Sequence, residues 1–257
     1  HRTISSNGGD GMSGALLGPQ YSHAQIQTEL DEAGAVYEIM PEDQLIDYTA
    51  NSIGEGAAVG WFQGKMEFGP RALGGRSILA DPRSSETQKT LNLKVKYRES
   101  FRPFAPSVLL EEADEWFDVD VDSPYMLVVA PVKSDRRREM TEEENELFGI
   151  DKLNTQRSEI PAVTHVDYSA RVQTVSRDTS PLYYKLIEAF KARTGCPVLV
   201  NTSFNIRGEP IVCTPSDAFR CFMGTDLDLL VIGNCVLRKS LQNSNLRVDY
   251  TDAFDLD

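Results

Sequence analysis

Three segments of the sequence combine positive charge with glycine or with small polar side chains. The first runs from Gly64 to Ser77 and places Lys65, Arg71 and Arg76 among four glycines and a proline. Glycine lets backbone N–H groups approach an anion closely, and the planar guanidinium group of arginine matches phosphate or carboxylate oxygens. The segment indicates either an anion-binding loop or a glycine-rich turn with arginines on the surface.

The second segment interleaves cations with aromatic residues. Its cations are Lys94, Lys96, Arg98 and Arg102, and its aromatic residues are Tyr97, Phe101 and Phe104. Cations alone would be typical of the solvated C-terminal end of a helix, where they interact favourably with the helix dipole. Because large aromatic side chains are mostly buried, their presence between the cations favours the basic wall of a pocket.

The third segment, 199–210, is an apolar strand that runs directly into Asn201, Thr202, Ser203 and Asn205. Ligands often bind where strands of an α/β sheet end, although such residues also form turns by bonding to their own backbone. The sequence has no GxxxxGK[ST] loop, no GxGxxG motif that opens a helix and no GxSxG motif. Any ATP chemistry therefore requires a nucleotide site of another kind.

Charge and composition exclude several classes of function. The net charge is −13, which argues against bulk binding to nucleic acid or to an anionic membrane. No run of 18 apolar residues and no basic, apolar leader is present, so we expect a cytoplasmic protein without a membrane span. The four cysteines share no CxxC spacing and the chain has only three histidines, so we predict reduced thiols and no metal site within this chain.

The hydrophobic pattern predicts an α/β fold in which helices flank a mixed, twisted sheet. Predicted helices cover residues 22–33, 42–53, 84–96, 181–193 and 215–223, with a short acidic helix that ends at 117. Predicted strands cover 57–62, 104–110, 125–132, 170–175, 197–201, 227–232 and 236–239. The glycine- and arginine-rich segment after residue 62 is expected to be a loop.

Four long runs carry a resemblance to a known family. They are GWFQGKMEFGPRALGGRSILADPR (60–83), VKYRESFRPFAPSVL (95–109), THVDYSARVQTV (164–175) and VLVNTSFNIRGEPIVCTPSDAFRCF (198–222). In this order they resemble the C-terminal region of the NodU/CmcH-type O-carbamoyltransferases, over roughly residues 18 to 240. More weakly, the Lys96-Tyr97-Arg98 and Ser203-Phe204-Asn205 runs are similar to the KxR and SxN elements of YrdC/Sua5 enzymes.

The resemblance implies a YrdC/Sua5-like fold and a division of the chain. Residues 19–240 would form the carbamoyl-adenylate-forming domain, with 133–159 as an exposed, charged excursion and 241–257 as an acidic tail. Residues 1–18 would be a linker or the end of a Kae1-like N-terminal domain of the same polypeptide. Because the chain begins with His1 rather than Met, we expect it to be a fragment. In the family that N-terminal domain receives the carbamoyl group and holds a metal bound by His and Asp.

The resemblance also implies a site and its substrates, ATP with Mg²⁺ and carbamoyl phosphate. Lys96, Arg71 and Arg171 would be catalytic, as cations on the phosphates and the carbamoyl oxygen. Residues that would bind the substrate or nucleotide are Ser203, Asn205, Met126, Arg98, Arg102 and Arg76, with Met126 as an apolar wall for adenine. We expect five of these cations to converge on one pocket, since two polyanions repel each other unless cations hold them together. They are Lys96, Arg71, Arg98, Arg102 and Arg171.

The sequence departs from the family pattern at Gly75, where an Asn is usual, and 133–159 is longer than in relatives. Two alternatives stay open. One is a threonylcarbamoyl-adenylate synthase of tRNA modification, which shares the KxR and SxN elements. The other is a nucleotide-binding module without catalytic activity.

Overall fold

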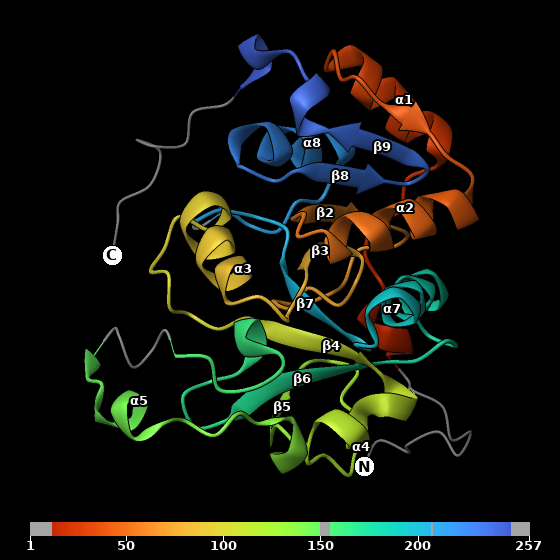
Figure 1. Cartoon of the computed structure of the whole chain (residues 1–257). Helices are drawn as coiled ribbons and strands as arrows, with labels where there is room; N and C mark the ends of the chain where they lie inside the picture. The colour runs from red at the N-terminus through yellow and green to blue at the C-terminus, as the bar shows by residue number, and fades with distance from the viewer. Residues whose placement is uncertain (1–11, 150–154, 207, 248–257) are drawn as a thin grey trace.

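A mixed sheet organises the chain (Figure 1). The computed structural model describes residues 12–149, 155–206 and 208–247, and within them the sheet has nine strands. The strands are β1 Glu38–Ile39, β2 Val59–Phe62, β3 Arg76–Ala80, β4 Ala105–Leu109, β5 Val128–Pro131, β6 Ser169–Val175, β7 Val198–Ser203, β8 Leu229–Ile232 and β9 Cys235–Arg238. The predicted mixed α/β architecture is confirmed.

The strand order is β1-β9-β8-β2-β3-β7-β4-β6-β5. β2 pairs with β8 in parallel and β4 pairs with β6 in parallel, while the other neighbouring strands are antiparallel. Ala105 of β4 lies opposite Asn201 of β7, and Ser107 lies opposite Gln173 of β6. The starts of β4 and β6 therefore meet the end of β7 at one end of the strands.

Helices cover the sheet and are fixed by local capping. The described helices are α1 His23–Glu32, α2 Glu42–Gly54, α3 Ser85–Thr90, α4 Ala113–Trp116, α5 Glu142–Glu146, α7 Pro181–Thr194 and α8 Pro215–Gly224. As predicted, Ser22 caps α1, in a capping box with Gln25. α2 and α7 pack on each other and against β3, β4 and β7, while α1 packs on α8 beside β8.

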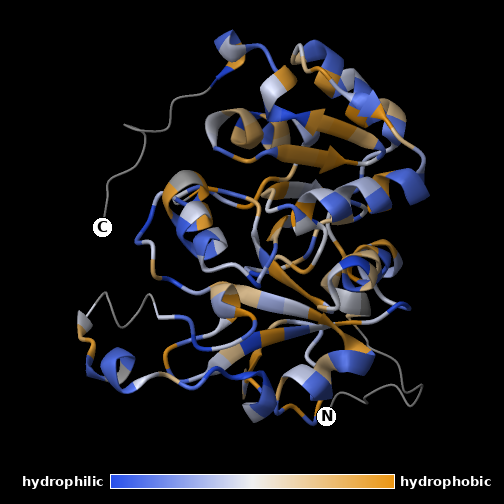
Figure 2. Cartoon of the chain, viewed as in Figure 1, coloured by the Kyte–Doolittle hydropathy of each residue, from blue (hydrophilic) through white to orange (hydrophobic). Residues whose placement is uncertain are grey.

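The core lies along the central strands, where Figure 2 shows apolar residues concentrated. Every residue of β2, β3 and β4 is buried. Gly60 of β2 faces the ring of Phe204, and a Cβ at this position would lie 2.7 Å from the ring. Only glycine allows this close approach, so Phe204 can fill the space beneath the strand.

The prediction was wrong for the segment after β2, because β3 begins at Arg76. This arginine is 0% exposed, and its guanidinium group stacks 3.5 Å over the Phe62 ring and donates to the carbonyl oxygens of Gln63, Gly64 and Pro19. The backbone thus accepts hydrogen bonds from both Nη groups, while Nε has no partner among the described residues, and these contacts allow a buried cation to open a strand. The short β1 was also missed.

The strand predicted for 125–132 begins three residues late. Met126 has a φ of 55°, in the left-handed region that strands do not use, so regular pairing starts at Val128. The structure therefore places Met126 in the turn that enters β5 rather than within the strand.

The charged segment 133–159 is attached to the fold at its base. The backbone N–H of Arg138 donates to Arg157, and that of Glu159 donates to Arg136. Arg157 is buried, at 5% exposed, whereas α5 at the far end is exposed. The predicted linker up to residue 11, residues 150–154 and the acidic tail from 248 lie outside the described residues.

The C-terminal segment before residue 248 also packs back on the fold. Gln242 bonds to both the N–H and the carbonyl of Val36, and Leu246 packs against the core. In the part of the chain that the structure describes, no helix has the length and apolar character needed to cross a membrane.

Candidate functional site

Three arginines from distant segments line one cavity of about 180 Å³ where β4 and β6 start and β7 ends. Arg71 comes from the β2–β3 connection, Arg98 from the segment before β4, and Arg171 from β6. Met126, Asn201 and Ser203 are among the other residues that line it. We call this space the arginine cavity.

The charge of the arginine cavity is unbalanced. Among the described residues that line it, none is acidic. The Nε atoms of Arg71 and Arg171 are buried and have no hydrogen-bond partner in the described structure. Burial, and then the positive charge of Arg71, lower the pKa of Arg171. Two guanidinium groups that repel each other, in a cavity with no acidic residue among its described lining, favour a site for an anion.

Lys96 lies behind Ser203 and is 5% exposed. Its Nζ donates to the carbonyl oxygen of Asn205 at 2.9 Å and to its Oδ1 at 2.8 Å, and it also contacts the carbonyl oxygen and the Oγ of Ser203. None of these acceptors carries a charge. Burial lowers the pKa of Lys96 to about 7, with a smaller contribution from Arg98 that Cys221 opposes.

Lys96 gives a pH prediction for stability. Its pKa is about 7 in the folded chain, whereas the ordinary value of 10.5 applies to the unfolded chain. At pH values between these two, the unfolded chain therefore binds more protons than the folded chain. The contribution of Lys96 to the free energy of unfolding should therefore rise with pH, by on the order of 1 kcal/mol per pH unit. The free energy of unfolding, measured with urea at pH 7, 8 and 9, should increase for the wild type relative to a Lys96→Met variant. If the difference in unfolding free energy between the two proteins stayed constant over this pH range, the lowered pKa of Lys96 would be contradicted.

Glu67 shapes the loop that presents Arg71. The carboxylate is 3% exposed, and its Oε1 accepts hydrogen bonds from the backbone N–H groups of Leu73, Gly75 and Arg76 at 2.7, 2.6 and 3.0 Å. A carboxylate that holds several backbone N–H groups fixes a loop conformation. Sequence reasoning missed this residue, although a lone acid within a basic, glycine-rich loop was a usable signal.

Glu67→Ala should destabilise the chain by on the order of 3 kcal/mol, because three buried N–H groups lose their acceptor. Urea unfolding measures this loss, with Glu86→Ala on exposed α3 as the control. A Glu67→Ala variant as stable as the control would show that the loop does not depend on this carboxylate.

Gly75 is closed to a side chain in this chain. A Cβ here would lie 2.7 Å from the carbonyl oxygen of Lys65 and 3.2 Å from the carboxylate of Glu67. The Asn that is usual in the family pattern would therefore require a shift of this loop.

A buried polar network forms the floor of the arginine cavity. Asn201 donates through Nδ2 to the carbonyl of Ala72 and to Gln173 Oε1, which also accepts from the Ser107 hydroxyl. Gln173 Nε2 donates in turn to the carbonyl of Leu73. The network joins three strands to the Arg71 loop. Sequence reasoning did not single out Asn201 or Gln173 as floor residues.

A sequence model described as the carbamoyltransferase C-terminus matches residues 50–239. The chain belongs to the carbamoyltransferase family. It is 56% identical over 91% of its length to sll1178, an uncharacterised protein of Synechocystis, and 44% identical over 86% to the nodulation protein NolO of Bradyrhizobium diazoefficiens. It is 34% identical over 85% of its length to the 3'-hydroxymethylcephem-O-carbamoyltransferase of Streptomyces clavuligerus.

This carbamoyltransferase chain spans little more than a third of each of these relatives, namely 38%, 38% and 37% of their lengths. A solved structure of full-length HypF in its phosphate- and nucleotide-bound form matches 72% of the chain and 20% of HypF, with 18% identity and a TM-score of 0.43. That similarity is too low to carry an argument.

Two of the predicted site residues lie away from the arginine cavity. The guanidinium group of Arg76 is enclosed by backbone carbonyls, so it stabilises the fold and does not face the arginine cavity. Arg102 is half-exposed and pairs with Glu99 at 2.9 Å. We expected Arg102 to converge with Arg71 and Arg171, and Arg76 to bind the substrate or nucleotide, but neither is among the described residues that line the arginine cavity. Charge spacing does not reveal which cations the local backbone or a neighbouring acid engages.

The other predicted residues lie at or next to the arginine cavity. Arg71, Arg98, Arg171, Met126 and Ser203 line it, while Lys96 and Asn205 contact Ser203 from behind. Met126 is 2% exposed and packs with Leu73 and Ala105.

Proposed function

We propose that this carbamoyltransferase chain joins a carbamoyl group to AMP, using carbamoyl phosphate and ATP. The observation that carries the proposal is the convergence of Arg71, Arg98 and Arg171 on one cavity without a lining acid. Two polyanions can occupy adjacent positions only where cations screen them, and such cations stabilise charge that develops on phosphate in the transition state. Because the lining lacks carboxylates, Mg²⁺ would enter bound to the phosphates of ATP.

The reaction balances in two steps. Water first releases phosphate from carbamoyl phosphate and leaves carbamate. A carbamate oxygen then attacks the α-phosphorus of ATP, the bond from that phosphorus to the bridging oxygen breaks, and pyrophosphate departs with its electron pair. The products are carbamoyl-adenylate, pyrophosphate and phosphate. Arg71 and Arg171 would hold the phosphates, and the cavity would limit access of water to the mixed anhydride.

Asn201 supports a carbamoyl group as the substrate. Its Nδ2 faces the carbonyl of Ala72, which can only accept, so Oδ1 must point elsewhere. Asn201 is 1% exposed and lines the arginine cavity, and its Oδ1 has no partner among the described residues. The amino group of a carbamoyl moiety would supply the missing hydrogen-bond donor.

Lys96 would act at the same site through Ser203. Anion binding in front of Ser203 would favour the protonated lysine, since opposite charges raise the pKa of a buried amine. Ser203 and Asn205 would then connect this cation to the phosphate or ribose oxygens of the nucleotide.

Transfer of the carbamoyl group to an acceptor hydroxyl would take place in the part of the protein that the chain does not span. The matched region covers 38% of sll1178, so well over half of that relative lies outside it. We propose that this remainder holds a Kae1-like domain with its own metal, which accepts the adenylate.

The test is exchange of labelled pyrophosphate into ATP by the full chain. Carbamoyl phosphate should support exchange, whereas threonine with bicarbonate should not. Acetyl phosphate has a methyl group where carbamoyl phosphate has an amino group, so Asn201 would stay unpaired and exchange should be at least about a hundredfold slower. Equal rates with acetyl phosphate would remove Asn201 from substrate selection, and no exchange with carbamoyl phosphate would overturn the proposed function.

A further inference from the structure

The segment that carries Lys96 and Arg98 has an irregular backbone. Residues 96–104, which we call the Arg98 segment, form neither a helix nor a strand. They follow the π-helical turn Leu91–Val95, where the backbone N–H of Lys96 donates to the carbonyl five residues before it. Tyr97 has a φ of 48°, in the left-handed region that large side chains rarely adopt. Contacts with the rest of the fold must therefore hold this segment in place.

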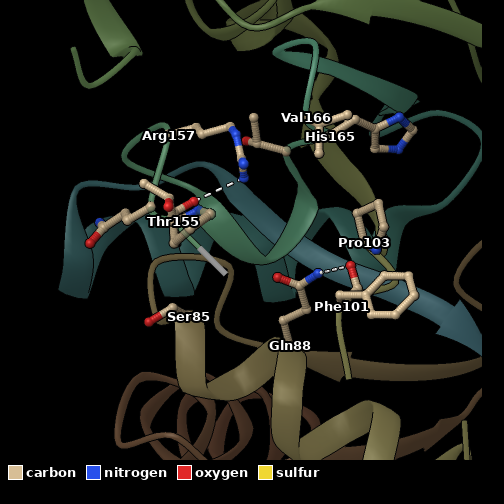
Figure 3. Close-up of a pocket in the computed structure, with 11 residues that line it drawn as sticks. Ser85, Gln88, Phe101, Pro103, Thr155, Arg157, His165 and Val166 are labelled. Carbon is tan, nitrogen blue, oxygen red and sulfur yellow. Dashed lines mark hydrogen bonds between the residues drawn. The ribbon is translucent and has the colours of Figure 1, made fainter. Parts of the chain in front are cut away.

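Two amide side chains hold the Arg98 segment. Gln88 reaches from α3 and donates through Nε2 to the carbonyl of Phe101 at 2.8 Å (Figure 3). Asn92 is 0% exposed and donates through Nδ2 to the carbonyl oxygens of Ser100 and Arg102, at 3.0 and 2.8 Å. Because both N–H groups of the Asn92 amide have carbonyl acceptors, the direction of its side-chain oxygen is fixed.

That oxygen is directed at Arg98. Oδ1 of Asn92 accepts from Nε of Arg98 at 2.6 Å, and the carbonyl oxygen of Asn92 accepts from the Arg98 backbone N–H at 3.0 Å. The guanidinium group also lies over the buried Phe104 ring, 5.0 Å from its centre. Since a guanidinium group is planar and rigid, a bond at Nε and a ring against its face together set the direction of both Nη groups.

Asn92 holds Arg98 in a way that an acid could not. An amide oxygen is an uncharged acceptor, so this bond places the guanidinium group without compensating its charge. Arg102 shows the opposite arrangement, because it pairs with Glu99 at 2.9 Å and is not among the described residues that line the arginine cavity. A cation that must act on a bound anion needs the first arrangement.

We infer that Asn92 is a positioning residue that aims Arg98 at the arginine cavity, and this inference rests on the proposed function. The other two arginines of the cavity are held by different means. Arg171 is part of β6, and Arg71 lies in the loop that Glu67 fixes. Arg98 has neither support, so the Asn92 amide supplies its orientation.

The test is a double-mutant cycle, measured as carbamoyl-phosphate-dependent exchange of pyrophosphate into ATP by the full chain. Arg98→Met should slow exchange about a hundredfold, as expected for the loss of one preorganised donor. Asn92→Leu should slow it about tenfold, because a misdirected Arg98 stabilises the transition state less well. In the Arg98→Met background, Asn92→Leu should slow exchange less than about twofold, since the residue through which it acts is gone.

A residue that only stabilised the fold would slow exchange by the same factor in both backgrounds, and that result would overturn the inference. The matched control is Gln88→Leu, which removes the other amide that holds the Arg98 segment. Whatever its effect on the rate, the factor should be equal with and without Arg98. A coupling to Arg98 as large as that of Asn92 would assign the effect to the whole segment and remove Asn92 as the positioning residue.

A further variant decides the matter if Asn92→Leu does not fold. Arg98→Lys keeps the positive charge and leaves Asn92 with both of its backbone acceptors, but it has no planar group whose direction one bond could set. Exchange should be slowed about tenfold or more. Exchange within about threefold of the wild-type rate would show that charge alone is sufficient, which overturns the inference.

The outcomes separate this inference from the proposed function. If the wild type supports no carbamoyl-phosphate-dependent exchange, the proposed function fails and the role of Asn92 fails with it. If the wild type is active but Arg98→Met or Asn92→Leu leaves the rate unchanged, only the role of Asn92 is overturned. The proposed function would then stand on Arg71 and Arg171.

Discussion

Replacing Lys96 by alanine is expected to abolish carbamoyl-phosphate-dependent exchange of pyrophosphate into ATP, with a loss of at least about a thousandfold. Lys96 is the buried cation behind Ser203, and its Nζ reaches acceptors on both Ser203 and Asn205. Without it, charge that develops on the nucleotide phosphates loses a nearby positive group in a region of low dielectric. The measurement is the exchange rate at saturating ATP.

The control for Lys96→Ala is Lys89→Ala, because Lys89 is exposed on α3. Circular dichroism and the unfolding midpoint report whether the variant is folded, and Lys96→Met, which keeps the aliphatic stem, serves where alanine leaves a cavity. Full exchange activity in a folded Lys96 variant would remove this lysine from the mechanism.

Arg171→Ala should lower the exchange rate by about a hundredfold, the size expected for loss of one preorganised charge donor. Arg171 lines the arginine cavity from β6, and its buried Nε has no partner among the described residues. Its removal also relieves repulsion with Arg71, so the variant should remain folded and gain rather than lose stability.

The matched control is Arg102→Ala, which removes a half-exposed arginine that pairs with Glu99 outside the cavity. It should retain exchange activity within about threefold of wild type, as expected for a surface ion pair. Equal losses in the Arg171 and Arg102 variants would mean that net charge, rather than the cavity, controls nucleotide binding.

Much of the fold could be predicted because the hydrophobic pattern has the period of the elements it forms. The capped helix after Ser22 and the apolar strand that ends at Ser203 follow from local chemistry alone. β3 could not be predicted in this way. Its first residue is Arg76, and only tertiary contacts with the carbonyls of Gln63 and Pro19 make a buried cation acceptable there.

In the candidate site, too, some features follow from the sequence and others depend on tertiary contacts. Motif resemblance identified Arg71, Lys96 and Arg171 as residues that belong together, and the structure places them around one cavity and its rear wall. The resemblance could not separate Arg71 from Arg76, because both arginines lie in the same glycine-rich segment. The partners of each arginine depend on residues far along the chain, and spacing carries no information about them.

The residues that hold the site in place were the least predictable. Glu67 and Gln173 act by fixing backbone groups of the Arg71 loop, since Glu67 accepts from its N–H groups and Gln173 donates to the carbonyl of Leu73. Their contribution is visible only when donors and acceptors of the folded chain are matched one by one.

The most direct test of the central claim is ³¹P NMR analysis of the phosphorus products made by the full chain from carbamoyl phosphate and ATP with Mg²⁺. Attack on the α-phosphorus at the arginine cavity predicts pyrophosphate and an AMP-containing mixed anhydride, formed together, and formed about a hundredfold more slowly by the Arg171→Ala variant. Release of ADP without pyrophosphate would contradict the account, because it would place the reaction at the γ-phosphate.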